Sequence, residues 1–436
     1  MTNMPPRLDW RKPRTGLAPL VVLVVVVAST TGRADTPGSL PADEQSAAGQ
    51  RELQNVDAAV AWLSAKAKEM IRASQRTMKD GTAAFPPQVG THYEAFWLRD
   101  YCYMLEGAID AFSDRELEDA CRLFVTAVRK DGAGVDCVKF NGTPIYKPGY
   151  GSMGAHAVAD GSPFTVAVAW HAFRQTKDLD LLRSIIDKLE LAMGAVPRNS
   201  ETGLVHIEPG KRQERCPYGF TDSIPKQGDV LFCSLLYVQA SRQMADLYKA
   251  LDRPEEARRW SSEAERVAKQ IRDVFWNPEW GLFRAATVKC NQPDIWGSAF
   301  AVSLGVADRR QALSIARYFR DHYGELVEHG QIRHLPRGTY WEGCPYRDRY
   351  QNGGYWATPV GWFVFTLDRV DPKLADQTIL AMVRDFQRRG VNEWVLGDKV
   401  AVPGYLASIS LPLADIRRML ARRRDQPTNS PQEPAK

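Results

Sequence analysis

Residues 229–275 read DVLFCSLLYVQASRQMADLYKALDRPEEARRWSSEAERVAKQIRDVF and contain two helical patterns separated by a very short link. Apolar side chains recur at three- and four-residue steps through 229–251 and again through 255–275, which is the period of a helix that buries one face. Pro254 and the two glutamates after it suit the first turn of the second helix. The polar Asp252-Arg253 link therefore predicts a helical hairpin.

The same pattern recurs along most of the chain and gives twelve candidate helices in all. A further example is 56–71, where apolar residues from Val56 to Met70 form one stripe. Strand-like alternation is scarce and is confined to 203–207 and 281–284. The other candidate helices span 97–112, 115–129, 162–175, 179–195, 297–304, 309–323, 357–369, 372–388 and 412–422.

The connections between these helices alternate between short polar links and long segments rich in glycine, proline and aromatic residues. The long connections span 81–96, 131–160, 197–228, 276–296, 324–356 and 390–408. This alternation predicts an all-α fold, an (α/α)6 toroid of about twelve helices in which six hairpins close into a double ring. The long loops would gather on one face and carry function. A plain α-solenoid is disfavoured, because no sequence repeat of about 34 to 47 residues is present.

The N-terminus has the layout of a secretory signal. Basic residues between Arg7 and Arg14 precede the apolar run 17–28, and small residues then allow cleavage before Asp35. A membrane-spanning helix needs about 20 residues, so the run favours a cleaved signal over a permanent anchor. We expect a signal peptide at 1–34, a secreted or periplasmic protein and no stable membrane span. Residues 35–50 read as a flexible leader, 51–423 as the toroid domain and 424–436 as a disordered tail.

The charge of the chain argues against nucleic acid as a partner. The formal net charge is +5, and residues 1–34 carry five cations and one anion, which leaves only +1 for the mature part. Binding to a phosphate backbone needs a clear excess of basic residues.

We also expect no cofactor and no metal. The sequence has no HExxH pattern, and the G-x-G-x-x-G match at 149–154 follows no convincing strand. The seven cysteines are irregularly spaced, and we expect mostly free thiols in the core with at most one bridge.

Two of the long loops combine carboxylates with aromatic residues near the start of a predicted helix. Arg99 and Asp100 could share sugar hydroxyls, because a guanidinium donates and a carboxylate accepts, while Trp97 could stack on a sugar ring. Asp222 lies among apolar residues that would raise its pKa, as a general acid requires. The structural alternatives are a local salt bridge for the first pair and an Asx-turn for Asp222. We assign Asp229 as the N-cap of the next helix.

Two later stretches have a similar composition. Segment 339–356 contains Trp341, Glu342 and Trp356, together with Gln351 and Asn352, whose amides both donate and accept hydrogen bonds. Its structural alternative is a buried aromatic cluster. Farther along the chain, Glu393 lies in Val391-Asn392-Glu393-Trp394-Val395 and could act as a base, although an exposed loop glutamate would give the same pattern.

Taken in order, these stretches resemble the six-hairpin glycoside hydrolases, the clan of glucoamylases, trehalases and debranching glucosidases. Residues 96–100 are similar to the W-x-R-D motif of that clan, and 219–223 resemble the segment that supplies the general acid. Residues 350–356 resemble its Y-Q-N-G-G loop, and 392–394 together with 404–408 resemble the segment of the general base. One departure is that no second carboxylate adjoins Asp222.

The resemblance implies an exported hydrolase that cleaves terminal glycosidic bonds of oligosaccharides, glucosides by family analogy, with inversion at the anomeric carbon. It implies Asp222 as the general acid and Glu393 as the general base, with Glu342 as a rival base. The implied sugar contacts are Trp97, Arg99, Asp100, Trp341, Glu342, Gln351, Asn352 and Trp356. The alternatives are a sugar epimerase, a polysaccharide lyase or a phosphorylase on the same toroid, or a carbohydrate-binding protein without activity. The scattered histidines disfavour the epimerase.

Overall fold

The computed structural model describes residues 55–146, 158–209 and 223–425. The chain divides into two units, Met1–Ala47 and Ala48–Lys436, and every described residue belongs to the second. The expected signal peptide, the whole of the expected leader and Asp222, the expected general acid, lie outside the described residues, as do 426–436 of the expected tail.

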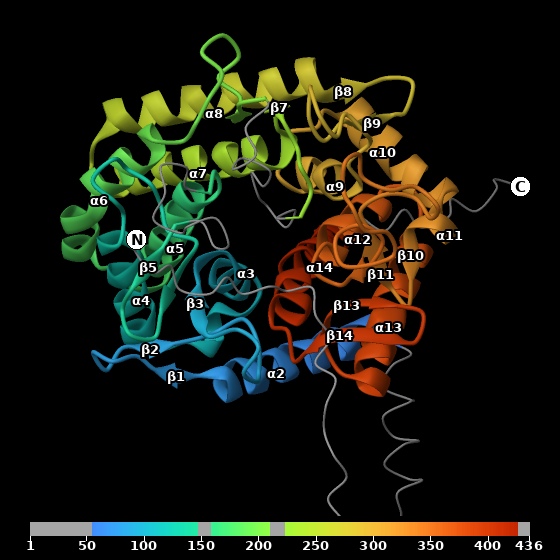
Figure 1. The fold of residues 1–436 in the computed structure, drawn as a ribbon, viewed down its shortest axis with the longest axis horizontal. Coiled ribbons are helices and arrows are strands. Elements are labelled where there is room, and N and C mark those ends of the chain that lie inside the picture. The colour runs from blue at the N-terminus through green and yellow to red at the C-terminus, as the bar shows by residue number, and fades with distance from the viewer. Residues whose placement is uncertain (1–54, 147–157, 210–222, 426–436) are drawn as a thin grey trace, which may run out of the picture. The chain divides into compact units, whose positions relative to one another are not determined.

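Six helices of the second unit form a closed inner ring (Figure 1). Each helix packs against the next in chain order, and the last packs against the first, so the ring closes through the contact between α14 and α3. The inner helices are α3 (Leu98–Ala108), α5 (Gly161–Thr176), α7 (Leu231–Ala250), α9 (Ile295–Ser303), α12 (Val360–Leu367) and α14 (Ala407–Asp425).

Six further helices surround this ring and alternate with the inner helices along the chain. Among them, α8 packs on α7, α4 and α6 pack on α5, α10 and α13 pack on α12, and α2 packs on α14. The outer helices are α2 (Val56–Ser74), α4 (Asp114–Thr126), α6 (Leu179–Gly194), α8 (Pro254–Phe275), α10 (Arg309–Asp321) and α13 (Pro372–Arg389). The predicted (α/α)6 toroid of twelve helices is therefore confirmed. Two short helical turns, η1 (Ile109–Ala111) and α11 (Tyr323–Leu326), complete the helical segments that the structure describes.

Burial explains which helices are inner and which are outer. All residues of α9 and α12 are buried, and these helices are apolar on every side. Helix α8 instead buries a single stripe that runs from Ala257 through Trp260, Ala264 and Ile271 to Phe275. A helix that is apolar all round needs neighbours on every side, whereas an amphipathic helix can face water.

The predicted starts of several helices are correct. The carboxylates of Asp178, Asp308 and Asp371 each accept a hydrogen bond from a backbone N–H in the first turn of α6, α10 and α13, respectively. Pro254 and Pro372 occupy first-turn positions. These side chains satisfy N–H groups that the helix itself leaves unpaired.

Two local predictions were wrong. Helix α7 is capped by Val230 without a side-chain hydrogen bond, and Asp229 belongs to strand β7 (Gly228–Asp229), where its carboxylate binds other loops. Helix α14 begins at Ala407 and contains Pro412, whereas the sequence predicted a start at 412. A proline usually marks the first turn, and here it lies inside the helix.

Close packing holds α14 against its two inner neighbours. A Cβ atom on Gly107 of α3 would lie 1.7 Å from the carbonyl oxygen of Ser410, and one on Gly361 of α12 would lie 2.7 Å from that of Pro412. Only glycine permits backbones to approach this closely. The closure of the ring therefore depends on these two glycines.

The six long connections all lead from an outer helix to the N-terminus of the next inner helix. They carry short antiparallel strands that the sequence analysis mostly missed. All of the described strands except β13 and β14 have only two or three residues, which leaves no alternation to detect, and the five-residue strands β13 and β14 were missed as well. The largest sheet has the order β10 (Val327–Glu328), β11 (Gln331–Arg333), β12 (Tyr355–Trp356), β13 (Asn392–Leu396) and β14 (Lys399–Pro403). A second has the order β3 (Ala95–Trp97), β4 (Cys137–Lys139) and β5 (Pro144–Ile145). The remaining strands pair as β1 (Arg76–Thr77) with β2 (Ala83–Ala84), β6 (His206–Ile207) with β7, and β8 (Trp276–Asn277) with β9 (Leu282–Phe283).

Aromatic side chains fill the middle of the inner ring. The ring of Trp362 lies 4.7 Å from that of Phe300, 5.7 Å from that of Phe232 and 6.3 Å from that of Tyr103. These four residues come from four different inner helices. The ring is therefore packed solid at this level, and the loop face is separated from the opposite end.

The cysteines in the described part of the chain are free thiols. Cys102, Cys121 and Cys233 are buried in helices, as the sequence predicted, and burial raises the pKa of Cys121 to about 12. Cys216 lies outside the described residues.

Candidate active site

Arg99 joins the starts of two inner helices at the loop face. Its Nε donates to Asp160 Oδ2 at 3.0 Å, and its Nη2 lies 3.3 Å from Asp136 Oδ1. Asp160 precedes α5, and Asp136 reaches Arg99 because β3 pairs with β4 and the N–H of Leu98 binds the Asp136 carbonyl. Burial alone would lower the pKa of Arg99, but attraction by Asp160 and Asp136 raises it well above its ordinary value. Arg99 is therefore a fixed cation.

Asp100, in the first turn of α3, binds a tyrosine from the other end of the chain. Its Oδ1 accepts a hydrogen bond of 2.5 Å from the hydroxyl of Tyr405, and its exposed fraction is only 5%. Burial, followed by the charge of Asp100, raises the pKa of Tyr405 well above its ordinary value. The phenol therefore stays protonated and serves as a hydrogen-bond donor.

Glu393, in strand β13, has an equivalent partner. Its Oε1 accepts a hydrogen bond of 2.6 Å from the hydroxyl of Tyr93, and its exposed fraction is 3%. The ring of Tyr93 lies 6.1 Å from that of Tyr405 and 5.7 Å from that of Trp97. The structure thus brings Glu393 and Asp100 to one cluster, in which adjacent tyrosines hold the two carboxylates.

Segment 350–356 forms one wall of this cluster. Tyr355 pairs with Val395 across β12 and β13, and the ring of Trp356 lies 6.4 Å from that of Tyr405. Trp356 is fully buried, and its ring also contacts that of Tyr350 at 5.2 Å. Trp356 therefore packs behind the site and offers no exposed face in this structure.

The amides of Gln351 and Asn352 hold loops together. Gln351 Oε1 accepts hydrogen bonds from both the N–H and the hydroxyl of Ser223, each at 2.9 Å. Asn352 Oδ1 accepts from the N–H of Trp341 at 2.8 Å, and its Nδ2 donates to the carbonyl of Tyr346. Ser223 directly follows Asp222 in the sequence, so this contact connects the loop of the expected acid to the segment beside Glu393.

Glu342 and Trp341 lie in a separate small cluster. Glu342 is exposed, and its Oε2 accepts a hydrogen bond of 2.9 Å from the N–H of Cys290. Trp341 is 3% exposed and lies beneath Lys226, whose Nζ is 5.2 Å from its ring centroid. Glu342 therefore binds the loop of Cys290, whereas Asp100 and Glu393 bind Tyr405 and Tyr93.

The sequence analysis did not single out four residues that organise this site. Tyr93 and Tyr405 lie inside or beside the stretches that the sequence analysis discussed. The sequence alone does not show which residue the hydroxyl of a tyrosine will bind. Asp136 and Asp160 lie in the long loop 131–160, and only the three-dimensional fold shows that both face Arg99.

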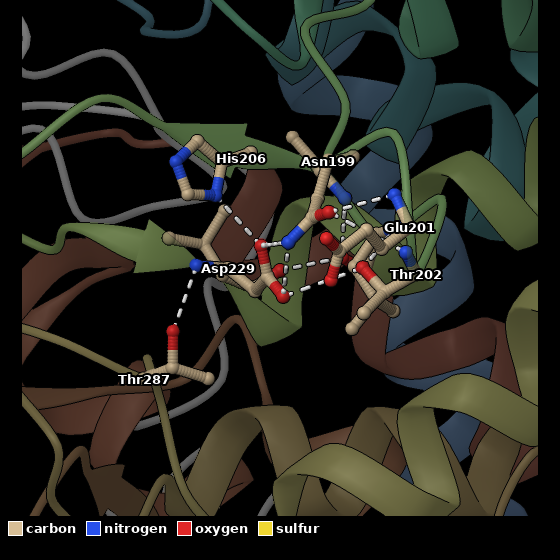
Figure 2. A network of polar contacts seen from close by, with 10 residues as sticks. Asn199, Glu201, Thr202, His206, Asp229 and Thr287 are labelled. Atoms are coloured by element: carbon tan, nitrogen blue, oxygen red, sulfur yellow. Dashed lines mark hydrogen bonds and ion pairs between the residues drawn. The ribbon is translucent and has the colours of Figure 1, made fainter.

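A polar network fixes the loops that lead into α7 (Figure 2). The carboxylate of Asp229 accepts from Asn199 Nδ2 at 3.1 Å and from Thr202 Oγ1 at 3.3 Å, and it lies 2.7 Å from His206 Nδ1. The N–H of Asp229 donates to Thr287 Oγ1 at 2.9 Å. This network joins the two described parts of the connection between α6 and α7, at 199–206 and at Asp229.

The described part of the chain offers neither a metal site nor a membrane-spanning helix. No group of three or more histidines, cysteines, aspartates or glutamates there could hold a metal ion. None of the described helices is long and apolar enough to cross a membrane.

Comparison with known proteins identifies the fold. No family model and no curated protein matches the chain. Among solved structures, a GH63 mannosylglycerate hydrolase from Thermus thermophilus, in complex with Tris, aligns at a TM-score of 0.59 and 16% identity over 81% of this chain and 99% of that chain. Its complex with glucose aligns at a TM-score of 0.56 and 17% identity, over the same shares of the two chains.

A GH78 family rhamnosidase of Bacillus sp. GL1 aligns at a TM-score of 0.53 and 15% identity over 82% of this chain and 35% of that chain. The fold is that of the (α/α)6 toroid glycoside hydrolases. The resemblance to six-hairpin glycosidases that the sequence suggested is thus present in three dimensions.

Proposed function

We propose that the protein is an exported glycoside hydrolase that releases a terminal sugar from an oligosaccharide or another glycoside with inversion. The observation that carries the proposal is the pair of buried carboxylates, Asp100 and Glu393, held by adjacent tyrosines at the loop face of a glycosidase-like toroid. Loops on a rigid scaffold are the usual place for catalytic residues.

In this proposal Glu393 is the general base. Its carboxylate removes a proton from a water molecule, whose oxygen attacks the anomeric carbon as the bond to the leaving oxygen breaks. Asp222 gives its proton to the leaving oxygen, so the products are the free sugar with inverted configuration and the alcohol. Inversion requires the two carboxyl groups to be about 6.5–9.5 Å apart. The contact from Ser223 to Gln351 supports this pairing, because it connects the loop of Asp222 to the wall beside Glu393.

Asp100 and Trp97 are the proposed contacts to the terminal sugar. Asp100 is held with its carboxylate at the cluster, and Trp97 is the only one of the three predicted stacking tryptophans that is not fully or almost fully buried. Arg99 is engaged by Asp136 and Asp160 and would position Asp100 at the start of α3. Gln351 and Asn352 would act by holding the loop that lines the site.

The substrate class is proposed from the resemblance and the comparisons together. A terminal glucoside is the first candidate. Because two of the similar structures are a mannosylglycerate hydrolase and a rhamnosidase, a mannosyl and a rhamnosyl glycoside are further candidates to test. Because the sequence predicts an export signal at 1–34, the proposed substrate is one met in the periplasm or the medium.

Replacement of the two rival bases tests the assignment. Glu393→Gln should lower turnover on a glycoside panel by about 10²–10⁴-fold, because it removes the base without changing the shape of the side chain. Glu342→Gln is the matched control, since Glu342 is exposed and hydrogen-bonded to Cys290. Near-normal turnover for Glu393→Gln together with a collapse for Glu342→Gln would show that the base is misassigned.

A further inference from the structure

A cavity, called the second cavity below to keep it apart from the proposed active site, lies at the end of the inner ring opposite the loops. Its volume is about 320 Å³, and it is lined by residues from the later turns of α3, α5, α7 and α9 and from the middle of α14. The long loops enter the N-termini of these helices, so their C-terminal ends point to the other face. Asp100 and Glu106 are separated by a rise of about 9 Å along α3.

The aromatic packing in the middle of the ring forms the floor of this cavity. Phe300 and Trp362 line it, and their rings lie 4.7 Å apart. At the mouth, Arg174, Arg242 and Asp246 are exposed. The cavity is therefore closed toward the proposed active site and open toward solvent.

Two buried polar atoms in the lining have no hydrogen-bond partner among the described residues. They are His171 Nε2 and Gln243 Oε1, on residues that are 8% and 5% exposed. Burial, and then the charge of Arg174, lower the pKa of His171 to about 3, so its ring is neutral. Buried polar atoms are almost always paired, which makes these two a sign of a missing partner.

Glu106 adds a third group with spare hydrogen-bonding capacity. It accepts one hydrogen bond of 3.3 Å from Gln239 Nε2, and it forms no ion pair with any described residue. Burial, and then the charge of Asp415, raise the pKa of Glu106 to about 7. By contrast, Asp415 is bound by Ser303 at 2.6 Å and by Arg418.

The three arginines of the lining already have partners of their own, and the guanidinium of Arg174 lies 4.5 Å from the ring centroid of Trp170. Arg242 donates to the carbonyl of Leu304 at 2.6 Å, and Arg418 donates to that of Ser303 at 3.0 Å, so both close the C-terminal end of α9. The lining contains three carboxylates and three arginines, and it favours neither an anion nor a cation. A neutral ligand rich in hydroxyl groups fits this balance, because each hydroxyl can donate and accept.

We propose that this cavity is a second binding site, for a neutral polyol of monosaccharide size. Hydroxyls of the ligand would donate to Gln243 Oε1 and Glu106 and pair with His171 Nε2, while the carbon face of the ligand lies against Trp170 or Trp362. The volume is at the lower end for small-molecule sites. The site does not depend on the proposed hydrolysis, because none of its residues belongs to the catalytic cluster.

A cavity-filling variant tests the proposal. The mature protein is titrated calorimetrically with glucose, mannose, rhamnose and glycerol, each alone. Ala414→Leu places a larger side chain in the cavity, and Ala421→Leu on the same helix is the matched control outside it. For at least one of these polyols, we expect one more bound equivalent in the wild type and in Ala421→Leu than in Ala414→Leu.

A second variant protects the test against misfolding of the first. Gln243→Leu keeps the approximate size of the side chain but removes the acceptor, and it should weaken binding at this site about tenfold or more. If Ala414→Leu and Gln243→Leu, both folded by circular dichroism, bind every polyol as the wild type does, the proposal is overturned. Equal stoichiometry of all variants would overturn it as well. Turnover of a glycoside, measured separately, reports on the active site alone.

Discussion

At the scale of single residues, the charge of Arg99 holds two buried carboxylates in place. Its side chain is 11% exposed, and those of Asp136 and Asp160 are 3% and 1% exposed. Replacement by methionine would keep the bulk of the side chain and remove the charge to which both carboxylates bind. Removal of one partner from a buried ion pair costs about 3–5 kcal/mol.

We therefore expect Arg99→Met to lower the free energy of unfolding by about 3–5 kcal/mol in urea denaturation. The matched control is Arg115→Met, because Arg115 is 91% exposed and lies 3.6 Å from Asp119. The control should change stability by less than about 1 kcal/mol. Equal stability of the two variants would contradict the role assigned to Arg99.

Tyr93 should act on catalysis through Glu393. Its hydroxyl donates to the carboxylate at 2.6 Å and thereby favours the ionised form that a base needs. Tyr93→Phe should raise the pKa of Glu393, so the acidic limb of the kcat profile should move to higher pH, with kcat about tenfold or more lower near pH 5. Turnover measured from about pH 4 to 8 checks this expectation.

The control for this change is Tyr323→Phe, which removes a phenol that pairs with Thr378 at 2.8 Å, a residue of the outer helix α13. Its pH profile should match that of the wild type. A Tyr93→Phe profile that superimposes on the wild-type profile would mean that Tyr93 does not tune Glu393.

The residue scale is also where prediction from the sequence stopped. The sequence drew attention to the stretches around Asp100 and Glu393, because carboxylates beside aromatic residues are visible in one dimension. The hydrogen bonds from Tyr405 and Tyr93 join residues about 300 positions apart, and nothing local records them. For the same reason, the sequence could not show that Arg99 faces Asp136 and Asp160 rather than a ligand alone.

At the scale of elements, the packing of α3 against α14 depends on the absence of a side chain. A Cβ atom on Gly107 would clash with the backbone of Ser410, at 1.7 Å from its carbonyl oxygen. We expect Gly107→Ala to lower the free energy of unfolding by about 1–3 kcal/mol, because α3 or α14 must move to make room for the added methyl group. Calorimetry measures this change.

Gly194→Ala is the matched control, because Gly194 lies in α6 and a Cβ atom there would contact nothing within 4 Å. Alanine is the better helix former, so this variant should be neutral or stabilised by up to about 1 kcal/mol. If Gly107→Ala behaves like Gly194→Ala, the close contact does not set the position of α14.

The helices were predicted well because an apolar stripe repeats over many residues and can therefore be recognised in the sequence. The twelve predicted helices are all present, and most ends agree within about four residues. The exception is the start of α14, which lies at Ala407, so that residue 412, the predicted start, is a proline inside the helix that packs closely against Gly361. Strands such as β12, with two residues, are too short for their alternation to be seen.

At the scale of the whole domain, closure of the ring explains why residues from the two ends of the domain meet in the candidate active site. The contact of α14 with α3 makes the loop before the last inner helix a neighbour of the loop before the first. Glu393 and Tyr405 thereby reach Tyr93 and Asp100. The alternation of short and long connections predicted the toroid, and a closed toroid already implies that its first and last loops meet. Which side chains pair across that junction is decided by packing.

Closure also separates the two ends of the inner ring. The aromatic residues around Trp362 fill the middle, so the proposed active site and the second cavity can be changed independently. Variants at Ala414 or Gln243 should therefore leave hydrolysis by the loop face close to normal, while Glu393→Gln should leave polyol binding at the second cavity unchanged.

The most direct test of the central claim is proton NMR of the first sugar released from a panel of α- and β-glucosides, mannosides and rhamnosides. We predict hydrolysis of at least one glycoside, with the initial product carrying the anomeric configuration opposite to that of the substrate, and loss of this signal in Glu393→Gln. Release of the same anomer as in the substrate, or no release from any glycoside, would contradict the account.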